Sequence, residues 1–410
     1  MCGERRDARP TACIGRICTV PLAKSQIFPL MDRGSNPLQA ISMRMEQAAT
    51  IPTRSWAAGD ARGFRRVMAA AAWRHRYVHG LALALFVLAV VVGRHTGNMP
   101  DTGALADFGF YLIVALWAGC CGFAIVRLAW LAAVERERAP LSAMLRSFRR
   151  FFADRERIAN GLNGIAAFTV FATAFAVRKG AIAILSPFTW DKDLSTAGRM
   201  LHFGRLPYEW LWWIAQSPLA VRLFNLAYNF WFVVLIASMF VVAITRRDTR
   251  LRHQYMLSLM LVWAVGGFFV AMGFSSAGPC YFADLGLGGD YLPLMKALDA
   301  ANRVYPIWAL STQKMLWSGY IGSGAGSIGI SAFPSIHVAT AVLFALYASR
   351  RSRVAGALMW AFAATIMVGS VVLAWHYAVD GYAGALISLT IWKLTGRWLD
   401  RFSPEGVAKA

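Results

Sequence analysis

The stretch ISAFPSIHVATAVLFALYASRRSRVAGALMWAFAATIMVGSVVLAWHYAVDGYAGALISLTIWKL (residues 330–394) decides the fold class of this chain. It contains the apolar runs 334–349 and 354–375 and most of a third run, 379–395. The runs are separated by the basic turn RRSR (350–353) and by a few polar residues around His376. Long runs with almost no charge are typical of helices that cross a bilayer.

The rest of the chain repeats this pattern. Apolar residues make up 58% of the 410 residues, and charged residues only 15%. The formal charge of +21 does not indicate a nucleic-acid partner, because most arginines lie in the amino-terminal tail and in short loops, as membrane topology requires. The sequence therefore predicts an all-α integral membrane protein of about eight transmembrane helices. The five upstream apolar runs are 78–93, 108–134, 162–177, 223–244 and 255–274.

Four segments follow from this count. We expect the last six spans to form one catalytic bundle, preceded by two extra helices. The predicted segments are a basic, disordered cytoplasmic tail (1–76), two extra transmembrane helices with a cytoplasmic loop (77–158), the six-helix domain (159–398) and a second cytoplasmic tail (399–410).

Arginine asymmetry predicts the orientation. Loops 135–160, 245–253 and 350–353 carry seven, four and three arginines, whereas the 59-residue loop 275–333 holds three basic residues. The positive-inside rule then places both termini in the cytoplasm. The expected setting is a bacterial inner membrane, and the loops predicted on its outer, periplasmic face are 94–107, 178–222 and 275–333.

The first stretch whose residues could take part in catalysis is AFPSIHVA (332–339). Pro334 suits the opening turn of a helix, where its missing N–H costs nothing. The free N–H groups of that turn and the Ser335 hydroxyl could bind an anion. His337, one turn deeper, could donate a proton to a phosphate oxygen. The alternative is a Pro-started helix whose histidine only caps a neighbour.

WHYAVDGYAG (375–384) is the second stretch. The i, i+4 spacing of His376 and Asp380 predicts that they share one face of a helix beginning at or before Trp375. The carboxylate could then fix the imidazole tautomer and leave the other nitrogen free to attack. An exposed helix pair is the alternative. Ionisable residues at the ends of membrane helices are costly and usually functional, and by span count both stretches lie at the outer face.

The phrases ISAFPSIHVATA (330–341) and GSVVLAWHYAVDGYAG (369–384) resemble the second and third signature motifs of the type 2 phosphatidic acid phosphatase superfamily. The similarity extends over roughly 160–395 and favours the branch that contains inositol phosphorylceramide synthases and sphingomyelin synthases. The resemblance implies that His376 is a nucleophile forming a phosphohistidine and that Asp380 orients it. It implies that His337 protonates the leaving group and later activates the acceptor. It also implies that no metal or other cofactor is required.

Two positions depart from that resemblance. The superfamily's phosphatases carry an arginine six residues before the third-motif histidine, where this chain has Ser370. Lys296 and Arg303 have the spacing of the first motif, but Val304 stands where proline is expected.

Asp191 and His202 in loop 178–222 could touch a headgroup. The candidate phosphate-binding residues are Ser335, Lys296 and Arg303, with Arg178 and Lys179 as alternatives.

These observations predict a membrane-embedded phosphotransferase that acts on a lipid phosphoester through a phosphohistidine. The acceptor is an alcohol or, if the protein is a lipid phosphate phosphatase, water. A lipid transporter is less favoured because inverted repeats and paired broken helices are absent. An inactive lipid-binding relative is less favoured because both histidines and the aspartate are retained. The sequence does not indicate the oligomeric state.

Overall fold

The computed structural model describes residues 61–97, 121–122, 124–245, 249–322 and 329–402. Within these residues every regular element is helical, which confirms the predicted all-α class. Two of the elements are not α-helices: η1 is a π-helix and η2 is a 3₁₀-helix. The elements are α2 (Ala61–Arg74), α3 (Arg76–Thr96), α5 (Pro140–Ala153), α6 (Arg155–Leu185), α7 (Asp191–Leu201), α8 (Pro207–Trp210), α9 (Trp212–Ala215), α10 (Pro218–Ala243), α11 (Thr249–Ala264), η1 (Val265–Val270), α12 (Ala271–Gly273), η2 (Pro279–Tyr281), α13 (Leu292–Val304), α14 (Trp308–Gly322), α15 (Ile336–Ser349), α16 (Arg353–Val372) and α17 (Ala378–Phe402).

Five helices of the described part are long and apolar enough to cross a membrane. They correspond to five of the eight predicted spans, and α11, η1 and α12 together make one of them. The five are Arg76–Thr96, Arg155–Leu185, Pro218–Ile244, Thr249–Gly273 and Arg353–Val372.

The other three predicted spans are not among these five helices. Helix α15 has 14 residues, and at about 1.5 Å per residue it is shorter than a bilayer core of about 30 Å. Helix α17 has 25 residues, but its last turns carry Arg397, Asp400 and Arg401. The predicted span 108–134 falls largely outside the described residues, which include its apolar helix Ala124–Ala133.

The described part of the predicted amino-terminal tail is ordered. Residues 61–74 form α2, so the expectation of a disordered tail is wrong for this segment. Its sequence ARGFRRVMAAAAWR is rich in alanine, the best helix former, and Ala71 is fully buried. Residues 1–60 of that tail lie outside the described residues.

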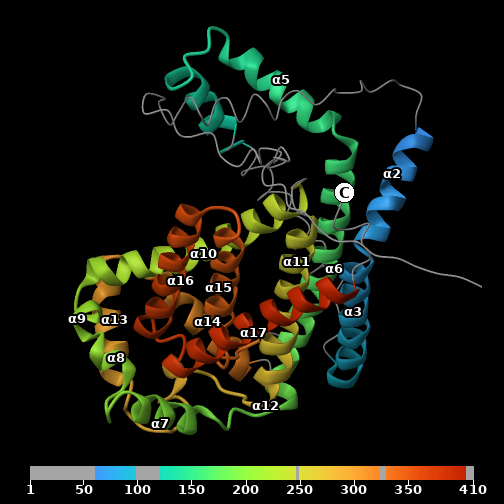
Figure 1. Ribbon diagram of the computed structural model, residues 1–410. Helices are drawn as coiled ribbons and strands as arrows, with labels where there is room; N and C mark the ends of the chain where they lie inside the picture. Colours follow the sequence, from blue (N-terminus) through green and yellow to red (C-terminus); the bar gives the residue numbers. More distant parts are fainter. Residues whose placement is uncertain (1–60, 98–120, 123, 246–248, 323–328, 403–410) are drawn as a thin grey trace, which may run out of the picture. The chain divides into compact units, whose positions relative to one another are not determined.

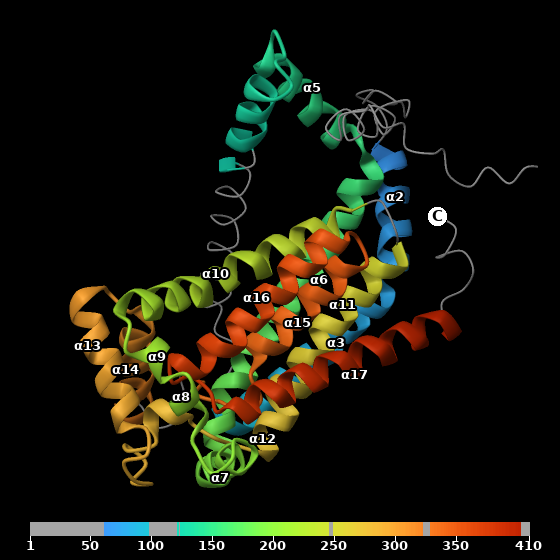
Figure 2. The same cartoon turned by 60° about the vertical axis from the view of Figure 1, so that its left-hand side comes forward.

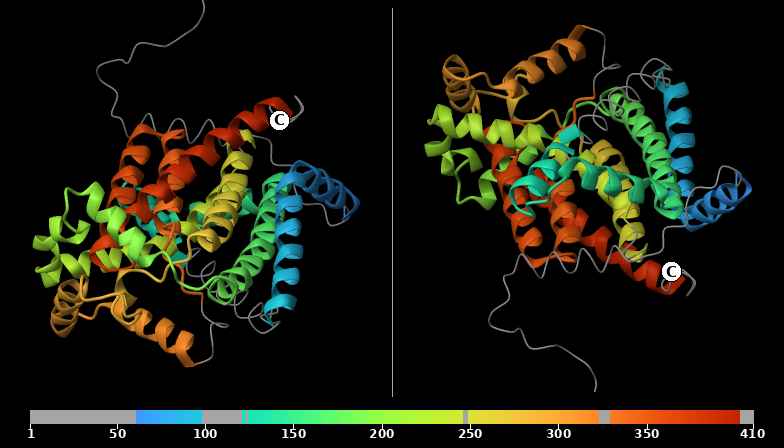
Figure 3. Two further views of the ribbon diagram at one scale, coloured as in Figure 1. Left: turned by 90° about the horizontal axis from the view of Figure 1, so that it is seen from below. Right: turned by 90° about the horizontal axis from the view of Figure 1, so that it is seen from above.

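The helices that carry the two chemically promising stretches lie side by side. Figure 2 shows α6, α10, α11, α15, α16 and α17 as neighbours, with the shorter helices α7, α8, α9, α13 and α14 gathered at one end. Helix α3 runs beside α6 (Figures 1 and 3). The short helices belong to the two long loops that the charge pattern assigned to the outer face.

A small residue allows α17 to approach α15 closely. A Cβ atom at Gly384 of α17 would collide with the carbonyl oxygen of Ser335, so only glycine fits here. Ser388, one turn further on, donates a hydrogen bond to the carbonyl of Ala339 at 2.6 Å. These contacts hold the start of α15 against the start of α17, where the two chemically promising stretches lie.

Candidate functional site

The first stretch starts α15 at Ile336, two residues later than the sequence predicted. Ser335 is the N-cap, and its hydroxyl accepts a hydrogen bond from the Val338 amide at 3.4 Å. The prediction that Pro334 occupies the opening turn is therefore wrong, because the serine side chain caps the helix and leaves the proline outside it. His337 lies in the first turn of α15 and not one turn deeper. Ser335 itself is fully buried.

The second stretch is not continuous with a helix. Helix α16 ends with the Trp375 amide donating to Ser370 O at 3.0 Å and the Ala374 amide donating to Val371 O at 3.1 Å. This is the Schellman pattern, with Ala374 in the left-handed conformation (φ 58°). Because that reversal occupies residues 373–376, α17 begins only at Ala378. The expectation that His376 and Asp380 share one helix is wrong.

The histidine and the aspartate nevertheless meet. His376 Nδ1 lies 3.4 Å from Asp380 Oδ2, and the Tyr377 amide donates to the same carboxylate oxygen at 3.0 Å. Asp380 is fully buried and lies in the first turn of α17, where the helix dipole favours a negative charge. A carboxylate on the Nδ1 side of an imidazole favours the tautomer with the proton on Nδ1, which leaves the lone pair on Nε2.

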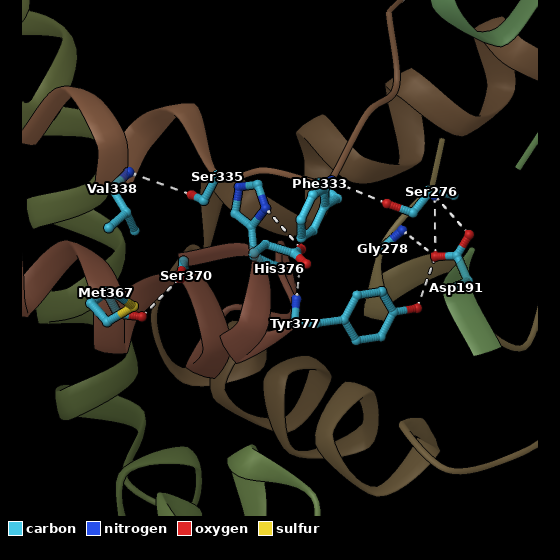
Figure 4. A network of polar contacts seen from close by, with 12 residues as sticks. Asp191, Ser276, Gly278, Phe333, Ser335, Val338, Met367, Ser370, His376 and Tyr377 are labelled. Carbon is cyan, nitrogen blue, oxygen red and sulfur yellow. Dashed lines mark hydrogen bonds and ion pairs between the residues drawn. The ribbon is translucent and has the colours of Figure 1, made fainter. Parts of the chain in front are cut away.

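Backbone hydrogen bonding joins the two stretches directly. The Ser335 amide donates to the Asp380 carbonyl at 2.9 Å. The ring centroids of His337 and His376 lie 6.3 Å apart. Figure 4 shows the His376 ring beside Ser335, at the start of α15. The structure therefore brings together His337, His376, Asp380 and Ser335, which the sequence selected.

Helix α10 supplies an aromatic setting for His337. The rings of Tyr228 and Trp231 lie 4.4 and 4.3 Å from the imidazole, centroid to centroid, and Phe232 meets it edge-on at 5.9 Å. The indole N–H of Trp231 donates to the His337 carbonyl at 3.0 Å. These contacts fix the position of the His337 ring.

A short segment that follows α12 and includes η2, residues 275–281, ties both stretches in place. Ser276 accepts from the Ala332 amide with its carbonyl at 2.9 Å and from the Phe333 amide with its hydroxyl at 3.1 Å. On the other side, the Cys280 amide donates to the Ala374 carbonyl at 3.0 Å. We call residues 275–281 the tie loop.

Asp191 of α7 fastens the tie loop to the residue beside the candidate nucleophile. Its carboxylate accepts from the amides of Ala277 at 2.9 Å and Gly278 at 2.8 Å, and from the Tyr377 hydroxyl at 2.8 Å (Figure 4). The carboxylate is only 1% exposed, so Asp191 is a structural clamp and does not reach a headgroup. Burial raises its pKa above the ordinary value, against the effect of its hydrogen-bond donors.

Gly278 was the one signal of this loop in the sequence. Its φ is +108°, and a Cβ atom there would lie 2.8 Å from the Trp375 carbonyl oxygen. The Gly278–Pro279 pair could have marked a backbone that must approach another segment closely. Nothing in the sequence pattern indicated which segment that is.

The other candidate phosphate ligands lie elsewhere. Lys296 and Arg303 are exposed on α13, whose buried face is formed by Leu294, Leu298 and Ala301, and no contact among the described residues joins them to either histidine. Arg178 is buried, with its guanidinium 5.4 Å from the Phe268 ring.

Two further polar residues from the outer loops have other surroundings. Lys179 is half-buried and close enough to His337 to interact with it electrostatically. His202 pairs with the Tyr382 hydroxyl at 2.9 Å. Among the described residues, no group of three or more His, Cys, Asp or Glu side chains is arranged to hold a metal ion.

One of three comparisons with known proteins finds a match. No curated protein and no solved structure matches the chain. A family model described as the PAP2 superfamily, the type 2 phosphatidic acid phosphatases, matches residues 192–394. That range includes both chemically promising stretches and the tie loop. Residues 192–394 are therefore a PAP2 superfamily domain.

Proposed function

We propose that the protein is a membrane-embedded phosphotransferase that moves a phosphoryl-containing headgroup between lipids through a phosphohistidine on His376. One observation carries this proposal: the Asp380 carboxylate lies 3.4 Å from Nδ1 of His376, and the His337 ring lies 6.3 Å away, centroid to centroid. A phosphorus atom needs to lie about 3 Å from the attacking nitrogen, and its leaving oxygen within about 3 Å of an acid. The separation of the two rings suits a phosphoryl group between them.

The first half-reaction uses all three side chains. Nε2 of His376 attacks phosphorus, the bond from phosphorus to the leaving oxygen breaks, and protonated His337 gives its proton to that oxygen. As the P–N bond forms, positive charge develops on the His376 ring. The Asp380 carboxylate stabilises that charge through Nδ1–H.

The second half-reaction reverses these roles. Neutral His337 takes the proton from the acceptor hydroxyl, whose oxygen attacks phosphorus, and the P–N bond breaks to restore His376. An alcohol acceptor gives transfer and water gives hydrolysis. Ser370, in place of the arginine found in the superfamily's phosphatases, favours transfer, as in inositol phosphorylceramide and sphingomyelin synthases. Hydrolysis of the same kind of substrate is the second candidate function, because the PAP2 superfamily match alone supports it equally.

The proposal includes a location. The arginine-rich loops 135–160 and 350–353 are placed in the cytoplasm with both termini, so the site opens on the outer, periplasmic face of a bacterial inner membrane. The substrate is then a lipid phosphoester of the outer leaflet. Protein donors meet its charge, and turnover needs no metal.

The test is to incubate purified protein with a panel of ³²P-labelled lipid phosphates and phosphodiesters, with and without lipid alcohols and EDTA. A new labelled lipid indicates transfer, and inorganic phosphate indicates hydrolysis. His376→Ala should lower either rate by roughly 10³ to 10⁶, whereas His95→Ala, at an exposed histidine of α3, should not. Label on the wild-type protein should be acid-labile and alkali-stable. More than a tenth of wild-type turnover in His376→Ala would remove His376 from the mechanism.

A further inference from the structure

The hydroxyl of Tyr228 is an unexplained polar group next to the site. Tyr228 is only 6% exposed, and its hydroxyl oxygen is buried without a hydrogen-bond partner. A buried hydroxyl that makes no hydrogen bond costs about 1–3 kcal/mol. Groups of this kind are uncommon in folded proteins, and each one needs an explanation, a catalytic role being one of them.

The position of the ring shows where that partner would be. One face of Tyr228 stacks on His337 at 4.4 Å with the planes 23° apart. On the other element packed against it, α16, a Cβ at Gly369 would lie 3.7 Å from Tyr228 Cδ2. The hydroxyl is also close enough to Asp380 and Cys280 to interact electrostatically with both. The stacked ring therefore places Tyr228 in direct contact with His337, the candidate acid.

Ser370, which stands where the superfamily's phosphatases carry an arginine, does not serve as a phosphate ligand. The Ser370 hydroxyl donates to the Met367 carbonyl at 2.8 Å, and the side chain is fully buried. It therefore turns back onto its own helix and offers nothing to a substrate. With Gly369 and Ser370 both small, the aromatic ring from α10 occupies the adjacent space.

We propose that the Tyr228 hydroxyl donates a hydrogen bond to a non-bridging oxygen of the substrate phosphate while phosphorus lies between His376 and His337. The inference rests on the proposed function and adds a specific ligand of the phosphate. The stacked ring fixes the hydroxyl relative to the acid, and the phosphate oxygen supplies the acceptor that the unliganded protein lacks.

Tyr228→Phe tests this, because it removes the hydroxyl and keeps the ring on His337. The matched control is Tyr255→Phe, at a buried tyrosine whose hydroxyl pairs with Ser238 at 2.6 Å and is not part of the site. Orthovanadate, an analogue of phosphate in its transition state, is the probe. Its binding is followed by the protection it gives against thermal unfolding, together with kcat and KM for the labelled lipid.

Loss of a hydrogen bond to a charged oxygen should weaken vanadate binding by about 10- to 100-fold in Tyr228→Phe. Thermal stability without vanadate should stay equal or rise, because an unsatisfied hydroxyl is gone. Tyr255→Phe should bind vanadate like the wild type and lose stability.

Three results would overturn the inference, and they differ in what else they remove. Wild-type vanadate affinity in Tyr228→Phe would remove Tyr228 alone and leave the proposed function intact. A fall in kcat with unchanged vanadate affinity would show that the hydroxyl orients Asp380, whose Oδ1 is also buried without a partner. No protection of the wild type by vanadate and no turnover of any lipid would remove the proposed function together with the inference.

Discussion

Replacing Asp191 should destabilise the protein and loosen the candidate site, although Asp191 is not one of the candidate catalytic residues. Asp191→Ala leaves three buried donors without an acceptor: the amides of Ala277 and Gly278 and the hydroxyl of Tyr377. Each unsatisfied buried donor costs about 1–3 kcal/mol. Since water will reach part of the vacated space, we expect a loss of about 3–5 kcal/mol in the free energy of unfolding.

The same change should slow the reaction. Tyr377 follows His376 directly in the chain, so release of the Tyr377 hydroxyl lets the candidate nucleophile shift. A misplacement of about 1 Å can cost on the order of 10² in rate, and we expect a fall of that size in kcat. Tyr377→Phe, which removes one of the three hydrogen bonds, should show a smaller loss of both stability and rate.

The assay is reversible unfolding in mixed SDS and mild-detergent micelles, with turnover measured on the same preparations. Asp193→Ala is the control, because Asp193 lies on the same helix and is exposed, and it should stay within about 0.5 kcal/mol of the wild type. A double-mutant cycle of Asp191→Ala and Tyr377→Phe should give a coupling of roughly 1–2 kcal/mol. Full additivity, or an Asp191→Ala protein as stable as Asp193→Ala, would refute the clamp.

Four further outcomes are expected. Burial raises the pKa of Asp191, so its contribution to stability is complete below the unfolded pKa of about 4 and is lost as pH rises through the folded pKa. The free energy of unfolding of the wild type relative to Asp191→Asn should therefore fall from pH 4 towards neutrality. A difference that does not change with pH would contradict this. His337→Ala should slow turnover of alkyl phosphoesters by roughly 10² to 10⁴ but leave aryl esters nearly unaffected, whereas equal losses would make His337 a binding residue. Ala374→Gly should raise the free energy of unfolding by about 1 kcal/mol, because it relieves the left-handed alanine; a loss of stability would show that no strain is stored there. In a cysteine-free background in intact cells, Ser311→Cys on α14 should react with a membrane-impermeant thiol reagent and Ser352→Cys should not, and the reverse pattern would turn the site to the cytoplasm.

The sequence by itself was enough to predict the helical membrane class and to select the candidate catalytic residues. Whether a segment is apolar and helical depends on its own composition, which is why five predicted spans correspond to helices long enough to cross a bilayer. The candidate trio His337, His376 and Asp380 also followed from local spacing. Counting helices then placed the three residues at one end of the bundle, and there the structure brings them together.

Local spacing was misleading where a helix ends. The i, i+4 separation of His376 and Asp380 suggested one continuous helix, yet the chain reverses at Ala374 and the two side chains meet across the start of α17. A glycine usually occupies the left-handed position at the end of a helix, and here that position is an alanine. The sequence therefore lacked the usual sign that the helix ends there. The structure places Lys296 and Arg303 on the exposed side of α13, and their role as phosphate ligands stays a prediction.

Only the tertiary structure decided what supports the catalytic candidates. Asp191 reaches the tie loop across 86 residues of sequence and Tyr377 across 186, and Trp231 reaches His337 across 106. Hydrogen bonds between such distant segments depend on how the helices pack, and neither residue type nor local periodicity records that packing. For the same physical reason, the stacking of Tyr228 on His337 could not be predicted from the sequence, although both residues stand in it plainly.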